Sequence, residues 1–134
     1  MQLEFHHVAV VVADLAVARM RYAAIGFPIP NCEEIIDQAV LVAAFDLGNG
    51  YVELIQPTDP DGPIARYLAK RGEGLHHVAY AVPDIDAALR HLGERGVRLI
   101  DAVPRRGAHG WRIAFVHPES CAGVLTELVE VEPA

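Results

Sequence analysis

Two histidines and two glutamates lie at corresponding places in the two halves of the chain. His7 and His77 are each the second residue of a His-His-Val-Ala run. Each half also holds one glutamate that is followed by leucine in an otherwise apolar stretch, Glu53 and Glu127. Imidazole nitrogens and carboxylate oxygens together suit a divalent first-row cation. Four protein ligands in a six-coordinate shell would leave two positions for water or substrate, where the cation acts as a Lewis acid.

The correspondence between the halves extends beyond these four residues. With an offset of 70, seven of the thirteen positions that start at His6 are identical to those that start at His76. The same offset pairs the Ala-Phe dipeptide at 44–45 with the one at 114–115, and a further slip of four residues pairs the two glutamates. An internal repeat of this length predicts a duplicated structural unit. A lone histidine on an apolar strand is more often structural, but the repeat favours a ligand role for both.

Each half shows the same order of predicted elements. An apolar strand comes first, and Asp14 or Asp84 then stands where a helix N-cap is expected, with Gly26 or Gly96 as the helix terminator. The buried stripe of the first helix is predicted to run from Leu15 through Ala18 and Tyr22 to Ile25. Three strands are predicted after each helix: Phe27–Ile35, Val40–Leu47 and Tyr51–Gln56, then Val97–Val103, Arg112–Val116 and Leu125–Val131.

This order predicts an α+β fold of two tandem βαβββ modules. A four-stranded sheet with one helix leaves a face uncovered, so we expect the modules to form a curved mixed sheet or barrel around a metal cleft. The whole chain, 1–134, is then a single domain. Module one covers about 4–57, a linker helix about 58–73, and module two about 74–131.

Alternation along the strands selects the histidines that face the cleft. Side chains two residues apart share a face, so His7 lies beside Ala9, and His77 has the same relation to Ala79. The neighbouring His6 and His76 then point away, and we assign them structural roles.

Charge, cysteine content and apolar runs argue against nucleic-acid partners, a disulfide framework and membrane association. The formal net charge of −7 disfavours nucleic acid. Two cysteines without a close-spaced pair predict no disulfide framework. Neither a signal-like start nor an apolar run of membrane-spanning length is found, so we expect a cytoplasmic protein with no membrane partner.

Basic residues gather at a few places despite the acidic total. They are Arg66, Lys70 and Arg71 in the linker, and Arg105, Arg106 and Arg112 in the second half. Ordinary solvated surface explains such groups, but some could contact the phosphates of a bulky substrate. The candidates for substrate binding are Lys70, Arg71, Arg106 and the loop residue His109.

In these features the chain resembles the vicinal oxygen chelate (glyoxalase/bleomycin resistance) superfamily, and within it the methylmalonyl-CoA epimerases. The likeness covers nearly the whole chain. Its most specific stretches are the Lys-Arg-Gly-Glu-Gly-Leu-His-His run at 70–77 and the ending from His117-Pro118 through Gly123-Val124-Leu125 to Glu127-Leu128.

The resemblance implies metal ligands at His7, Glu53, His77 and Glu127. It favours one divalent ion per chain, often cobalt (Co2+), with Zn2+, Mn2+ or Ni2+ as alternatives, an acyl-CoA thioester substrate and a homodimer. A proton alpha to a thioester can be removed when the enolate oxygen is held by a cation, and a carboxylate such as Glu127 can take it. Glu53, at the corresponding place, is the predicted second proton carrier.

One departure concerns that second carrier. Some epimerases carry another acid on the third strand, whereas residues 39–43 contain none. Glu53, a bound water, or Glu33 or Glu34 could take the role, and symmetry favours Glu53.

Three other functions remain open. A glyoxalase I-like lactoylglutathione lyase would use the same ligand set on a glutathione hemithioacetal. A non-catalytic small-molecule binding protein of the same fold would not need all four ligands. A dioxygenase would need more open positions than four protein ligands leave.

Overall fold

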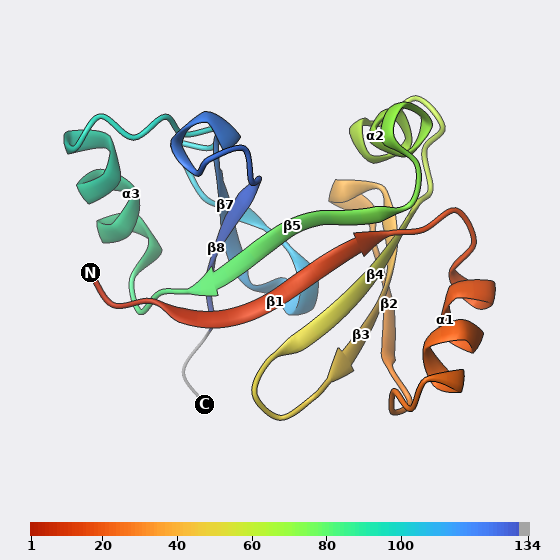
Figure 1. Cartoon of the computed structure of the whole chain (residues 1–134). Coiled ribbons are helices and arrows are strands. Elements are labelled where there is room, and N and C mark those ends of the chain that lie inside the picture. Colours follow the sequence, from red (N-terminus) through yellow and green to blue (C-terminus); the bar gives the residue numbers. More distant parts are fainter. Residues whose placement is uncertain (132–134) are drawn as a thin grey trace. The chain divides into compact units, whose positions relative to one another are not determined.

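The computed structural model describes residues 1–131, which form an α+β structure (Figure 1). Two compact units are present: His7–His76, and Met1–His6 together with the chain from His77 onward. The division falls between the two histidines of each pair, inside β1 (Glu4–Val11) and β5 (Gly74–Ala81). No helix within residues 1–131 is long and apolar enough to cross a membrane.

The first half has the predicted βαβββ order. After β1 come α1 (Leu15–Ala24), β2 (Asn31–Ile35), the 3-10 turn η1 (Ile36–Gln38), β3 (Val40–Asp46) and β4 (Tyr51–Pro57), followed by α2 (Pro63–Arg71). The strands lie in the order β2-β3-β4-β1. β2, β3 and β4 are antiparallel neighbours and β1 is parallel to β4, so this part of the sheet is mixed as predicted.

The second half repeats this order, with shorter strands after the helix. After β5 come α3 (Ile85–Glu94), β6 (Arg105–Arg106), η2 (Ala108–Gly110), β7 (Arg112–Val116), η3 (Pro118–Ser120) and β8 (Thr126–Glu130). The strand order is β5-β8-β7-β6, with β5 parallel to β8 and the other neighbours antiparallel.

Matching caps begin and end the module helices. The Asp14 carboxylate accepts the Val17 N–H at 3.1 Å, and the Asp84 carboxylate accepts the Ala87 N–H at 3.0 Å. Both aspartates have extended backbone, as N-caps require. Beyond the helix ends, Gly26 and Gly96 have φ of 104° and 76°, a region that favours glycine. Both predicted starts and both glycine ends are confirmed.

Three predicted details are wrong. The strand predicted from Phe27 begins at Asn31, because Pro28 and Pro30 have no N–H to donate to a ladder. Ile25 lies just past the end of α1 and is 72% exposed, so it is not part of the buried stripe.

The third wrong detail is the strand predicted at Val97–Val103. Only an isolated bridge forms there, between Leu99 and Val116, and β6 begins later. The physical reason is Asp101, whose carboxylate accepts the Phe115 N–H at 2.9 Å and so takes the place of a backbone carbonyl. A side chain that satisfies the neighbouring strand's donor competes with the regular ladder.

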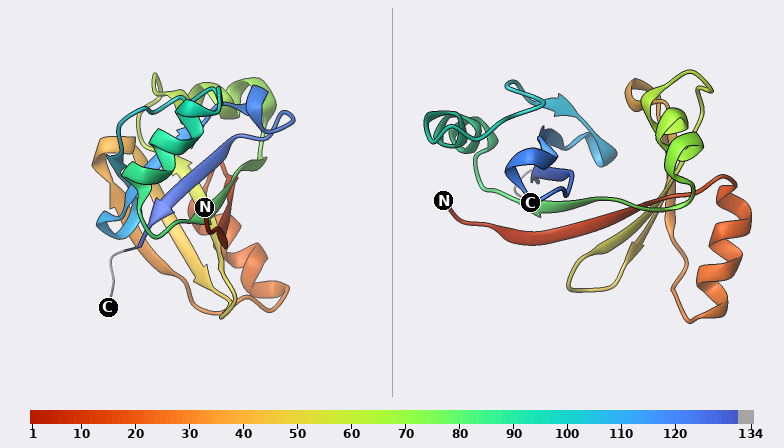
Figure 2. Two further views of the ribbon diagram at one scale, coloured as in Figure 1. Left: turned by 90° about the vertical axis from the view of Figure 1, so that its left-hand side faces the viewer. Right: turned by 45° about the horizontal axis from the view of Figure 1, so that its top comes forward.

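The strands of the first half bury both faces. On one face, α1 covers a cluster of Val12, Leu15, Ala18, Ala43, Phe45 and Leu54. On the other face, Ala9, Val11, Val40, Val42 and Ile55 form a second cluster, against which α2 places Ile64, Tyr67 and Leu68. Figure 1 and Figure 2 show α1 running beside β2 and β3. The two helices of this half therefore cover opposite faces of the same strands.

The second half has the same two-faced arrangement. On one face, α3 packs Ile85, Ala88 and Leu89 against Val82, Ala114, Val116 and Leu128. The opposite face carries Ala79, Ile113 and Val129, with Trp111 and Phe115 packed against them. In both halves the face away from the module helix is the one that carries the histidine and glutamate singled out by the sequence.

Candidate metal centre

In the first half, His7 and Glu53 lie side by side at the middle of the strands. β1 and β4 are parallel and place Ala9 beside Glu53, so His7 reaches the glutamate from two residues earlier on the same face. The imidazole Nε2 is 3.5 Å from the carboxylate Oε1. Both residues are buried, with 3% and 5% of their surface exposed.

The second half builds the same pair in the same way. β5 and β8 are parallel and place Ala79 beside Glu127. His77 Nε2 is 3.6 Å from Glu127 Oε2, and both residues are buried. Sequence and register therefore reproduce one local geometry twice, down to the small alanine beside each glutamate.

The donor set of each pair fits a divalent cation. Two neighbouring ligand atoms that each lie ~2.1 Å from one ion are themselves roughly 3.0–3.4 Å apart. The observed separations of 3.5 and 3.6 Å need little adjustment to reach that range. His7, His77 and Glu127 each offer a buried ligand atom. A buried histidine–carboxylate pair that receives a cation gains compensation for its burial.

Burial changes the titration of Glu53. Desolvation, with a smaller contribution from the charge of Glu33, raises the pKa of Glu53 from 4.5 to about 7. The cause is the loss of water around the charged form in an apolar face. A bound cation would reverse that preference, because an opposite charge nearby favours the carboxylate.

The first histidine of each pair packs against an aromatic ring, and its structural role stays a prediction. His6 meets the Trp111 ring edge-on at 4.7 Å, and His76 meets the Tyr67 ring in the same manner at 4.7 Å. Burial lowers the pKa of both from 6.5 to about 4, with the charge of His109 a smaller cause at His6. Both imidazoles are therefore neutral near pH 7.

The two glutamates have different partners on the neighbouring antiparallel strand, which is β3 in the first half and β7 in the second. Ala44 lies opposite Glu53, whereas Phe115 lies opposite Glu127. The Phe115 ring packs edge-on against His77, with ring centroids 5.2 Å apart.

This arrangement corrects one detail of the sequence repeat. The offset of 70 equates Phe45 with Phe115, but Phe45 is buried under α1 and Phe115 lies on the ligand face. The structural equivalents are Ala44 and Phe115, one residue out of step, and a slip of one residue moves a side chain to the other face. The aromatic neighbour of His77 was missed for that reason.

The loop after β6 presents His109. Its backbone is left-handed, with φ of 57°, which is uncommon for a residue other than glycine. The His109 ring lies 4.6 Å from that of Trp111, and the Arg106 guanidinium donates to the Gly110 carbonyl within the same turn.

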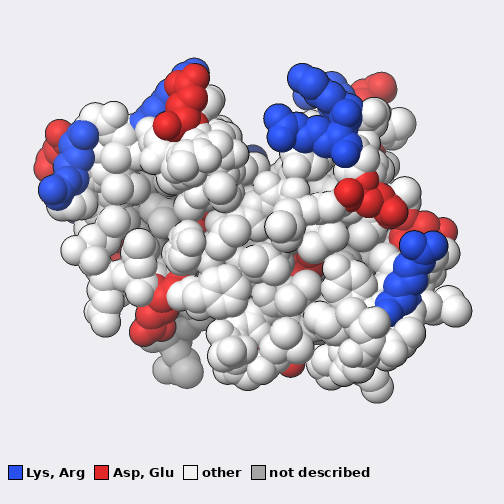
Figure 3. Space-filling model, viewed as in Figure 1, with Lys and Arg blue, Asp and Glu red and all other residues white. Residues whose placement is uncertain are grey.

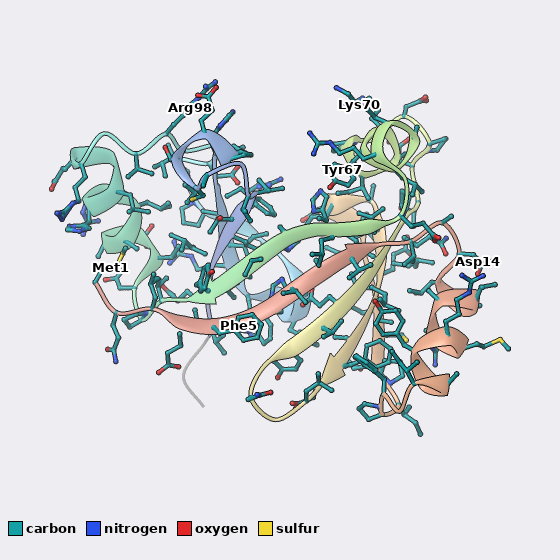
Figure 4. The ribbon with its side chains drawn as sticks, in the orientation of Figure 1. Met1, Phe5, Asp14, Tyr67, Lys70 and Arg98 are labelled. Atoms are coloured by element: carbon teal, nitrogen blue, oxygen red, sulfur yellow. The ribbon has the colours of Figure 1, made fainter. Side chains whose placement is uncertain are left out.

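The basic residues of the linker gather on α2, as Figure 3 shows. They are Arg66, Lys70 and Arg71, all exposed. Arg71 lies over the Tyr67 ring at 5.4 Å, and the Tyr67 hydroxyl donates to the Leu75 carbonyl at 2.8 Å. Lys70 extends away from the helix (Figure 4). Tyr67 thus packs against one of these three exposed cations.

Known proteins share this architecture. The profile of the Glyoxalase/Bleomycin resistance protein/Dioxygenase superfamily matches residues 6–115. The mitochondrial methylmalonyl-CoA epimerase of Bos taurus is 40% identical over 129 residues, which cover 92% of this chain and 71% of the relative. The chain belongs to the methylmalonyl-CoA epimerase family of this superfamily.

Other members of the family agree in extent and in fold. The ethylmalonyl-CoA/methylmalonyl-CoA epimerase of Cereibacter sphaeroides is 37% identical over 129 residues, 94% of this chain and 96% of the relative. A Streptomyces coelicolor methylmalonyl-CoA epimerase variant, solved in complex with 2-nitronate-propionyl-CoA, superposes with a TM-score of 0.88 at 36% identity, over 97% of this chain and 98% of that one. The vicinal oxygen chelate fold and the resemblance to epimerases are confirmed, and the comparisons favour an epimerase over a glyoxalase I.

Proposed function

We propose that the chain is a metal-dependent epimerase of methylmalonyl-CoA or of a close 2-substituted malonyl-CoA such as ethylmalonyl-CoA. The observation that carries the proposal is the buried histidine–glutamate pair, built twice at equivalent register positions. Membership of the epimerase family supports the substrate class. Two buried pairs of this kind would be costly in a protein that only sequesters an apolar molecule.

The proposed ligands of one divalent ion are His7, Glu53, His77 and Glu127. When bound, such an ion acts as a Lewis acid that stabilises negative charge on the thioester oxygen. Cobalt is the metal favoured by resemblance, and the nitrogen and oxygen donors suit Zn2+, Mn2+ and Ni2+ as well.

The proposed base is Glu127, which removes the proton alpha to the thioester. The substrate alpha carbon then becomes planar, and a proton returned to its other side inverts the centre. Glu53 corresponds to Glu127 by the repeat and is the symmetry-based choice for the second carrier, which stays a prediction.

The remaining predictions concern the rest of the substrate and the assembly. Lys70, Arg71, Arg106 and His109 are proposed to contact the acyl-CoA, the cations through its phosphates. Solved relatives in complex with methylmalonyl-CoA or with 2-nitronate-propionyl-CoA support a CoA substrate. We also propose that residues 1–134 work as one domain, with the module boundaries given above, and as a cytoplasmic homodimer.

The direct test is exchange of the alpha proton in deuterium oxide, followed by NMR. The metal-loaded protein is mixed with methylmalonyl-CoA, and separately with the methylglyoxal–glutathione hemithioacetal. We expect exchange and inversion of the CoA ester and no lactoylglutathione. Turnover of the hemithioacetal alone would instead support the glyoxalase I alternative. Activity that is unchanged after complete removal of metal would contradict the Lewis-acid role.

A further inference from the structure

The ligand face of the first half carries a second acid besides Glu53. Glu33 on β2 lies opposite Val42 on β3, and Val42 lies opposite Ile55 on β4. Residues directly opposite one another share a face, and so do residues two apart along a strand. Glu33 therefore points to the same side of the strands as Glu53.

The surface between Glu33 and Glu53 is apolar. Between their strands lie Val42 and Ala44, which are 2% and 6% exposed. Charges are screened little in such surroundings. Glu33 is itself half-buried, so part of this residue is accessible to water.

Other acids near this face are less suitable. Glu34 is exposed, and alternation turns it to the opposite face. Asp46 lies on the ligand face but is exposed at the end of β3, where its carboxylate accepts the Gly48 N–H of the turn. Among the strand residues that the structure describes in this half, Glu33 is the half-buried acid nearest in register to Glu53.

We propose that Glu33 carries the second proton of the epimerisation. This inference rests on the proposed function and replaces the symmetry-based choice of Glu53. Glu53 is almost fully buried, whereas Glu33 can exchange its proton with water directly.

The step balances in protons and electrons. Glu127, as the carboxylate, takes the alpha proton, and the electron pair of the broken C–H bond moves to the thioester oxygen as an enolate. Glu33, as the neutral acid, gives its proton to the other side of the alpha carbon and re-forms the C–H bond. Glu33 is left as the carboxylate and Glu127 as the acid, and both return to their starting states by exchange with water. The other epimer reacts with the roles reversed.

The experiment separates proton removal from inversion. Each epimer of methylmalonyl-CoA is incubated in deuterium oxide with wild type and with Glu33→Gln. We expect the variant to exchange the alpha proton of the epimer that Glu127 serves at a rate within about 3-fold of wild type. Inversion should fall by about 100- to 10,000-fold, the usual range for a lost acid–base group. Glu33→Asp should recover part of the inversion.

Glu34→Gln is the matched control, because it removes an adjacent charge from the opposite face and should change neither rate. Metal content and thermal midpoint should be the same in all variants. Inversion by Glu33→Gln at a rate near wild type would overturn the proposal, and so would an equal fall of exchange and inversion, which indicates a positioning role. A wild-type protein that neither exchanges nor inverts the ester would overturn the proposed function, and the role of Glu33 with it.

Discussion

The two histidine–glutamate pairs agree in their own geometry and differ in what surrounds them. In both, a parallel strand pair places an alanine beside the glutamate and sets the histidine nitrogen 3.5–3.6 Å from it. Glu53 lies opposite Ala44 on the neighbouring strand β3, and Glu33 lies on the same face of the next strand, β2. Glu127 faces Phe115, whose ring also packs on His77.

The residues around the two pairs have therefore diverged since the duplication, while the pairs themselves have kept their geometry. Burial, and to a smaller extent the charge of Glu33, leaves Glu53 in surroundings that favour a protonated carboxyl group. In the second half, the Phe115 ring packs against the His77 ring and occupies space beside Glu127 on the ligand face. On the proposed function, both pairs hold the same ion, and their different neighbours correspond to different roles in proton transfer.

The largest effect is expected at the proposed base. Glu127→Gln should slow alpha-proton exchange by about 100- to 10,000-fold, because an amide cannot accept the proton. NMR exchange with metal-loaded protein measures this rate, and circular dichroism checks the fold. Glu119→Gln, at an exposed ion pair with Arg98, serves as control and should exchange normally. Exchange by Glu127→Gln at the wild-type rate would exclude Glu127 as the base.

A second test asks whether the two pairs contribute equally to the metal. His7→Ala and His77→Ala should each weaken Co2+ binding by more than about 100-fold, beyond the 10- to 100-fold typical of a lost outer-sphere partner. Isothermal titration calorimetry gives the affinities. His6→Phe and His76→Phe keep an aromatic ring against Trp111 and Tyr67 and should bind metal as wild type does. A loss of Co2+ affinity in only one of the two alanine variants would show that the two histidines do not contribute equally to metal binding.

The third prediction concerns pH and the metal-free protein. The pKa of Glu53 is raised from 4.5 to about 7, so between these values the folded chain binds more protons than the unfolded chain. The free energy of unfolding then decreases as pH rises through this window. Ionisation of Glu53 should lower the free energy of unfolding of the metal-free protein by about 3 kcal/mol between pH 5 and pH 8.

Urea unfolding of wild type and Glu53→Gln at both pH values, in the presence of a chelator, isolates this contribution. The difference in stability between the two proteins should shift in favour of Glu53→Gln at the higher pH. His6 and His76 have lowered pKa values and act in the opposite sense at acid pH, but they are common to both proteins and cancel. A difference that is independent of pH would contradict the raised pKa of Glu53.

The smallest effect is expected at the helix N-caps, a feature that the two modules share. Asp14→Ala and Asp84→Ala should each lower the free energy of unfolding by about 1 kcal/mol, because each removes an N-cap hydrogen bond of nearly equal length. Urea unfolding at neutral pH measures both. Asp37→Ala, in the turn η1, offers a control without an N-cap role. Unequal losses at the two caps would show that the helices no longer contribute alike.

The sequence alone determined the duplicated βαβββ order, the caps and terminators of both module helices, and the histidine and glutamate of each pair. These follow from short-range rules: alternation along a strand, the N-cap preference of aspartate and the backbone freedom of glycine. The repeat also ranked His7 and His77 above their neighbours. Each of these signals is contained within a few residues.

Only the tertiary structure decided which side chains meet across strands. Asp101 replaces a backbone acceptor for Phe115 and ends a predicted strand, and Phe115 lies one residue out of the sequence repeat, on the ligand face. Glu33 was one of several possible acids until the register of β2 placed it on the face of Glu53. Pairing register joins residues far apart in the chain, and a shift of one residue reverses the face of every side chain, so local sequence patterns do not determine it.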